Sequence, residues 1–410
     1  MSFFGLGKPS DRYGVIIDVG SGSVLTAIVH SSPKQKHPQI VWSQREHAPL
    51  RNVDSLEQSA KAVMTALVNS SMLLDTEGRT ALREYNPDAK LTELQCSISA
   101  PWSYTVTKTI NYKQEKPFTI TEELIEELTH SLQQKIDNEI RENEAMQNLG
   151  LQVITRATMD SLSNGYRVED PIGEEAKEFS ISQGSVVAQN YLIDALDEMR
   201  DKLFPTTTGK KLSFILMLFS VTRELLPKTY DICLVDVTYE ATEIGVVRDG
   251  TLSYCTHTPF GSFSLAREIS AITNVPLHEA FGYLHTDKPL AFMEALSAEQ
   301  RKGVDAAIEA YIEKLSALFR ETGDALSIPK KISLHADLKS EPLFTGLIMK
   351  AAKRNLKSEP IITPISGKII EMTYAESTKK TTQVVTGDTA LLLSAQFFHK
   401  RKPRETFEYF

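Results

Sequence analysis

The chain has 410 residues, of which 41% are hydrophobic and 24% charged, and its formal net charge is −8. This length exceeds what one hydrophobic core usually organises, so two or more domains are expected. The acidic balance argues against a dedicated nucleic-acid-binding protein, and the longest apolar run, 212–221, is about half as long as a membrane-spanning helix.

The first half of the chain opens with strand patterns at 13–19, 24–31 and 39–46, which predict an antiparallel meander. A helix is predicted over 55–74, because its apolar residues recur at three- and four-residue steps. Further strands are predicted over 94–100 and 103–112. Thr119 and Glu122 then form a Thr-x-x-Glu pattern that predicts the start of a second helix. A helix near 191–203 and a linker over 204–211 end this half.

The second half repeats this plan. Strand-like runs are predicted at 213–221, 231–237, 242–247 and 251–259, followed by helices and by a strand over 331–337. The late helices are expected at 264–273, 277–284, 298–322, 343–354 and 389–399. In both halves a strand ends in an aspartate and a turn follows, at Asp18 and again at Asp236. The repetition predicts two α/β domains of related architecture.

The two acidic turns carry residue types suited to a phosphate site. The first combines a strand-end aspartate with glycines that can expose amides and serines that can donate hydrogen bonds: Asp18, Gly20, Ser21, Gly22 and Ser23. The second offers Asp236, Thr238 and Thr242. Two such turns facing each other predict a nucleotide site in which both carboxylates bind Mg²⁺ through its water shell.

These motifs resemble the actin-like ATPase superfamily, in the branch of the division protein FtsA and the type IV pilus assembly protein PilM. The matching stretches are IIDVGSGSV (16–24), NGYRVEDPIG (164–173), VDVTYEATEIGVVRDGTL (235–252) and TPFGSFSLAREIS (258–270). The N-terminal FGLGK and the serine-rich first turn are more similar to PilM. Segment 98–121 lies where this branch inserts its small SHS2 subdomain.

The resemblance implies two duplicated actin-like (ribonuclease H-like) domains that face a central cleft. The expected extents are 12–90 and 169–205 for the first domain, 91–168 for the inserted subdomain, 212–398 for the second domain with a helical part at about 264–328, and 399–410 for a basic-aromatic tail. It also implies ATP and Mg²⁺ as cofactors. The phosphate would then contact Gly20, Ser21, Gly22, Ser23, Thr238 and Thr242, and Asp18 and Asp236 would hold the metal.

Several departures from the family pattern leave nucleotide binding open. The second turn carries Val237, Tyr239 and Glu240 where glycines are expected, the ribose-contacting helix has Phe281 at the Glu position, and the late strand ends in His335, Ala336 and Asp337 instead of Gly-Gly. Glycine is hard to replace where a backbone must approach a phosphate closely. If the chain has any enzymatic activity, we expect weak ATP hydrolysis, and a non-catalytic or degenerate ATPase is the preferred interpretation.

The function implied by the resemblance is that of a cytoplasmic scaffold at the inner face of the membrane. It would bind the short cytoplasmic tail of a membrane-anchored pilus-assembly partner along an exposed strand, at Tyr104, Val106, Lys108, Ile110 and Tyr112. Its membrane association would be indirect, and self-association stays open. The alternatives are an FtsA-like division tether and a nucleotide-switched actin-like ATPase. The sequence contains no HExxH or Gly-x-Ser-x-Gly motif, and it offers no catalytic constellation.

Overall fold

The computed structural model describes residues 11–49, 56–142, 150–321, 328–336, 339–371 and 387–401. The FGLGK segment, Asp337 and most of the basic-aromatic tail lie outside the described residues. None of the described helices is both long enough and apolar enough to span a membrane.

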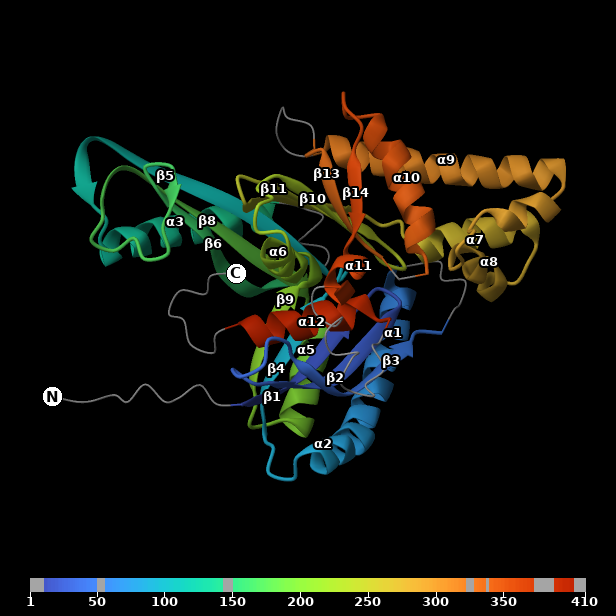
Figure 1. Ribbon diagram of the computed structural model, residues 1–410, viewed down its shortest axis with the longest axis horizontal. Coiled ribbons are helices and arrows are strands. Elements are labelled where there is room, and N and C mark those ends of the chain that lie inside the picture. The colour runs from blue at the N-terminus through green and yellow to red at the C-terminus, as the bar shows by residue number, and fades with distance from the viewer. Residues whose placement is uncertain are drawn as a thin grey trace.

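Two five-stranded sheets with the same topology form the body of the molecule (Figure 1). The first has the order β3-β2-β1-β4-β9, with β1 Arg12–Val19, β2 Ser23–Ser31, β3 Gln39–His47, β4 Leu91–Ile98 and β9 Thr208–Ser213. The second has the order β12-β11-β10-β13-β14, with β10 Ile232–Val237, β11 Thr242–Arg248, β12 Thr251–Thr258, β13 Lys331–His335 and β14 Ile361–Pro364. In each sheet an antiparallel meander precedes two parallel strands. The predicted α/β duplication is therefore confirmed.

Helices cover both sheets. Those of the first half are α1 Leu56–Leu73, the π-helical turn η1 Leu74–Gly78, α2 Arg79–Tyr85, α3 Glu122–Glu142, α5 Asn190–Leu203 and α6 Phe214–Leu225. Those of the second half are α7 Ser262–Thr273, α8 Leu277–Leu284, the 3₁₀ turn η2 Ala291–Ala295, α9 Ala298–Arg320, α10 Glu341–Lys353, α11 Ile365–Ile369 and α12 Thr389–Lys400. The helix predictions agree with these bounds to within a few residues.

Helices α6 and α12 join the two halves. The last helix of the chain, α12, packs Leu391, Ala395 and Phe398 against strands β1 and β2 of the first sheet. Helix α6 contacts β10 and β11 of the second sheet and also α12. Both helices therefore pack between the two halves, and the turns that end β1 and β10 are held opposite each other.

A third sheet, of order β5-β8-β6-β7, extends from the body at the left of Figure 1, where α3 covers it. Its strands are β5 Ser103–Thr119, β6 Leu151–Ser163, β7 Tyr166–Arg167 and β8 Glu175–Gln189. This sheet differs from the predicted subdomain at 91–168 in its boundaries. Segment 91–98 is β4 of the first sheet, because it pairs with β1, and 175–189 supplies the strand between β5 and β6.

Three local predictions are corrected by the structure. The apolar run 213–221 was expected to be a strand and forms α6, because a short continuous apolar run does not distinguish a buried strand from a buried helix. The helix after β5 is capped by Thr121, whose hydroxyl accepts from the amide of Leu124, and not by Thr119, which ends β5. The linker predicted at 204–211 contains the start of β9.

Candidate functional site

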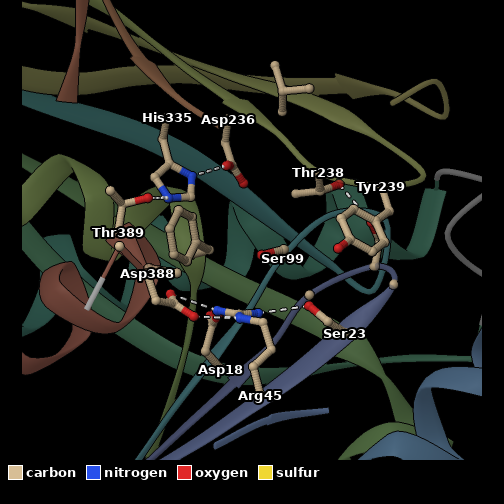
Figure 2. A pocket seen from close by; sticks show the side chains of 17 residues that line it. Asp18, Ser23, Arg45, Ser99, Asp236, Thr238, Tyr239, His335, Asp388 and Thr389 are labelled. Atoms are coloured by element: carbon tan, nitrogen blue, oxygen red, sulfur yellow. Dashed lines mark hydrogen bonds and ion pairs between the residues drawn. The ribbon is translucent and has the colours of Figure 1, made fainter. Parts of the chain in front are cut away.

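A cleft of about 280 Å³ lies between the turn after β1 and the turn after β10. Its walls also include Arg45 from β3, Phe214 from α6, His335 from β13 and the start of α12 at Asp388 and Thr389 (Figure 2). Seven of the predicted phosphate and metal residues line it: Asp18, Gly20, Ser21, Gly22, Ser23, Asp236 and Thr238. The volume lies just below the usual range for small-molecule sites, about 300–1,000 Å³.

Asp18, the first predicted magnesium ligand, faces a cation that belongs to the protein itself. The Arg45 guanidinium lies 3.7 Å from the Asp18 carboxylate and makes two short contacts with Asp388, at 2.6 and 3.0 Å. It also donates to the hydroxyl of Ser23, and Ser97 donates to Asp18 at 2.7 Å. Figure 2 shows Arg45 extended between the two carboxylates.

The titration of these carboxylates follows from burial and from Arg45. Burial raises the pKa of Asp18, and the Arg45 charge and the Ser97 hydrogen bond offset that only in part. Burial also acts to raise the pKa of Asp388, but there the charge and hydrogen bonds of Arg45 outweigh it and the pKa is lowered.

Asp236, the second predicted magnesium ligand, is fully buried and bonded to a histidine. The Nδ1 atom of His335 lies 2.7 Å from Asp236 Oδ1, and the Nε2 atom of His335 lies 3.2 Å from the hydroxyl of Thr389. The other carboxylate oxygen, Oδ2, is buried without a hydrogen-bond partner. Among the described residues there is no group of three or more His, Cys, Asp or Glu side chains suited to hold a metal ion.

The two turns bond directly to each other across the cleft. The Ser21 hydroxyl donates to Thr238 Oγ1 at 2.8 Å and accepts from the Glu240 amide at 2.8 Å. Within the turns, the Gly20 amide donates to the carbonyl of Ser23 and the Thr238 amide to that of Ala241. Backbone amides and hydroxyls that could have bound phosphate oxygens therefore bind protein atoms.

Tyr239 occupies the space beside the first turn. A Cβ atom added to Gly22 would lie 1.9 Å from the Tyr239 ring, so Gly22 is needed here for contact with that ring. The Tyr239 hydroxyl lies 3.1 Å from His47 Nδ1, and the ring packs edge-on against Phe281 at 5.2 Å. Phe281, at the position where the family pattern expects a ribose contact, thus belongs to an aromatic cluster.

The second turn is also held from behind by α7. The amides of Ser262 and Phe263 donate to the carbonyls of Thr238 and Tyr239. Arg267 makes a two-point ion pair with Glu240, at 2.8 and 2.6 Å. This ion pair explains the glutamate in the turn, because Glu240 points toward α7 and not into the cleft.

Two groups of predicted site residues lie elsewhere. Thr242 does not line the cleft, since its hydroxyl is buried between the carbonyl of Phe260 and the hydroxyl of Tyr311. The predicted partner-binding residues lie along β5, where Tyr104 packs on His257, Lys108 pairs with Glu139 of α3, and Ile110 and Tyr112 pack beside the core under α3. Val106 is buried.

A magnesium nucleotide does not fit this arrangement. Arg45 and His335 bond to the carboxylates that would bind the metal water shell. The amides of Gly20, Thr238 and Glu240 bond to protein atoms, and Tyr239 covers Gly22, which a phosphate would approach. Sequence reasoning found the aspartates and the missing glycines, but not Arg45, His335 or Asp388 as their partners. These three residues come from distant segments, and nothing in their local sequence indicates the contact.

Comparisons with known proteins show the fold. No family model matches the sequence, and no curated protein matches it. Among solved structures, the chain is similar to the PilM-PilN type IV pilus biogenesis complex, with a TM-score of 0.57 and 10% identity over 95% of this chain and 99% of that chain.

Weaker similarity extends to the ethanolamine utilization protein EutJ of Carboxydothermus hydrogenoformans, with a TM-score of 0.42 and 10% identity over 86% of this chain and 85% of that chain. A putative N-acetylmannosamine kinase of Listeria monocytogenes is similar with a TM-score of 0.40 and 10% identity over 95% of this chain and 98% of that chain. The chain resembles PilM over nearly the full length of both chains.

Proposed function

We propose that this chain, which has the actin-like ATPase fold and a structure similar to that of PilM, is a cytoplasmic scaffold that binds the tail of a membrane-anchored partner in type IV pilus assembly. The similar structure is that of a PilM-PilN complex, so a chain of this shape binds a partner protein there. The role assigned here is a scaffold that does not turn over ATP. The observation that supports a role without ATP turnover is that the two turns of the cleft bond to each other and that Arg45 and His335 bond to Asp18 and Asp236.

The tail is proposed to bind along β5. No described strand pairs with the outer edge of β5, and residues 109, 111 and 113–117 are exposed. An exposed strand edge can pair with an extended peptide, whose side chains then contact every second residue of the edge strand. The half-buried side chains of Ile110 and Tyr112 lie beside this edge.

The test is the affinity of a labelled synthetic peptide for the full chain, measured by fluorescence anisotropy. The peptide is the cytoplasmic tail of the candidate membrane-anchored pilus-assembly partner. We expect Tyr112→Ala and Ile110→Ala to weaken binding at least about tenfold, in the range of a residue that anchors an interface. Tyr166→Ala is the matched control, because Tyr166 is an exposed tyrosine of β7 at the opposite edge of the same sheet.

Binding that is unchanged in Tyr112→Ala and lost in Tyr166→Ala would place the partner at the opposite edge and contradict the proposal. The melting temperature of each variant should stay close to that of the parent, which shows that the fold is retained. Saturable binding of a fluorescent ATP analogue that is abolished in Asp18→Ala/Asp236→Ala would contradict the absence of nucleotide binding.

A further inference from the structure

The cleft contacts join the two halves of the molecule. We refer to four of them as the closure contacts: Ser21 with Thr238, Ser21 with the Glu240 amide, Tyr239 with Gly22 and His47, and Arg45 with Asp388. In each pair one residue belongs to the meander of the first sheet and the other to the second half of the chain. Nucleotide phosphates and Mg²⁺ commonly bridge two such turns. In this chain side chains make the bridge.

The same two turns contact the segment that connects the first sheet to the inserted sheet. The indole of Trp102 donates to the carbonyl of Gly20 at 3.0 Å, and the Ser99 amide donates to that of Val19. From the second half, Thr238 Oγ1 lies 3.5 Å from the carbonyl of Ala100. Residues 99–102 therefore bond to both turns immediately before β5 begins at Ser103.

Further contacts fix β5 against the second sheet. The side chains of Asp236, Glu243 and His257 are paired across neighbouring strands β10, β11 and β12, so they form a row on one face of that sheet. The row ends at Tyr104, whose ring lies 4.8 Å from that of His257. Thr107 of β5 donates to the carbonyl of Ser253 in β12. The position of β5 therefore depends on the relative position of the two halves.

We propose that the closure contacts hold the cleft permanently closed in place of a nucleotide, and that this closure sets the orientation of β5 for partner binding. This proposal concerns how the partner-binding site on β5 is regulated. It rests on the proposed function only for the part of the experiment that measures peptide binding. Partner binding is then independent of nucleotide. It depends instead on the side chains that make the closure contacts, which are distant from β5 in the sequence.

The experiment measures distances between spin labels in the full chain, on a Cys255→Ser background. Cys96 and Cys233 are buried and stay unlabelled. One pair of exposed labels, at Gln44→Cys and His278→Cys, spans the cleft, and a second pair, at Glu84→Cys and Lys116→Cys, links the first domain to β5. The parent is compared with Tyr239→Gly/Arg45→Gln, which removes two of the closure contacts.

The matched control is Tyr230→Gly/Arg83→Gln, which makes the same two replacements at an exposed loop tyrosine and an exposed helix arginine. We expect one narrow distance for each pair in the parent, unchanged by millimolar MgATP, and unchanged in the control. In Tyr239→Gly/Arg45→Gln both distributions should broaden, and the tail peptide should bind about tenfold more weakly, as expected for coupled sites.

Two results would overturn the proposal. A shift of the parent distances on addition of MgATP would show that nucleotide still controls the cleft. Broadening across the cleft with no change at β5 would show that closure does not set the orientation of the inserted sheet. The parent measurement with MgATP leaves all closure contacts intact, so a failure of Tyr239→Gly/Arg45→Gln to fold does not leave the proposal untested. If the peptide does not bind the parent, the scaffold function fails, while the distances still decide the question of closure.

Discussion

At the scale of single residues, the cleft shows how side chains can take the positions of a bound ion. Arg45 contacts both Asp18 and Asp388 and is itself largely buried, so the protein supplies its own cation to the carboxylates in this part of the cleft. Removing one member of a buried charge group leaves the others desolvated and uncompensated, which costs far more than an exposed ion pair contributes.

Arg45→Ala is therefore predicted to lower the free energy of unfolding by about 3 kcal/mol. Arg83→Ala, an arginine exposed on α2, should change it by no more than about 0.5 kcal/mol. Chemical denaturation monitored by circular dichroism measures both. Equal effects of the two substitutions would mean that Arg45 does not balance the carboxylates of the cleft.

Glu243 offers a pH-dependent prediction. Burial, together with the neighbouring charge of Asp236, raises its pKa well above the ordinary value of 4.5, although an Ala100 backbone hydrogen bond acts in the opposite direction. The stability that Glu243 contributes is thus fully present below pH 4.5 and is lost as the pH rises through the raised pKa.

Glu243→Gln removes this loss, because glutamine is neutral at every pH and keeps the shape of the side chain. The variant should therefore become more stable than the parent as the pH rises, and the difference should shrink toward the acid end. Thermal unfolding across that pH range measures it. A difference that is constant with pH would rule out titration of Glu243 as its cause.

At the scale of elements, the crossing of α12 onto the first sheet depends on a close approach of helix and strand. A Cβ atom added to Gly14 of β1 would lie 2.4 Å from the ring of Phe398 in α12. Arg12 reinforces this contact, since its guanidinium donates to the carbonyl of Phe398 at 2.7 Å and lies over the Phe398 ring. The glycine thus permits the helix to lie directly on the strand.

Gly14→Ala is predicted to destabilise the chain by about 2 kcal/mol, as expected for overpacking in a buried contact. Phe398→Leu makes room for the added methyl group, so Gly14→Ala/Phe398→Leu should lose less stability than the sum of the two single variants. A double-mutant cycle from denaturation curves gives the coupling energy. Strict additivity would mean that the added methyl group does not meet Phe398.

At the scale of the whole molecule, the packing of α12 on the first sheet makes the two halves depend on each other. Leu391, Ala395 and Phe398 of α12 pack on the first sheet, and they would be exposed in a second half expressed alone. Large apolar faces of this kind lead to aggregation when they have no partner. The domain extents predicted from the sequence therefore do not define units that fold independently.

A fragment covering 212–398 is predicted to be insoluble or poorly ordered alone, and co-expression with 1–211 is predicted to restore a soluble complex. Size-exclusion chromatography and the dispersion of amide resonances would measure this. A monomeric, well-dispersed fragment would show that the contacts of α12 with the first sheet are dispensable for folding of the second half.

The duplicated architecture and most of the elements could be predicted from the sequence. Periodic apolar patterns depend only on local spacing, so α1, α8, α9 and α12 were predicted closely, and the repeated Asp18 and Asp236 turns indicated two domains facing a cleft. Prediction from apolar patterns was wrong at α6, because an unbroken run of apolar residues has no helical or strand periodicity. It was also wrong at the boundaries of the inserted sheet, because strand pairing decides which segments belong to that sheet.

The contents of the cleft could be identified only from the folded structure. The missing glycines of the second turn could be read from the sequence, but their meaning depended on where the replacing side chains lie. Tyr239 covers Gly22, Glu240 turns away toward Arg267, and Arg45 and His335 bond to the two aspartates. The partners in these contacts come from separate segments of the chain, so the contacts leave no local pattern in the sequence and form only when the chain folds.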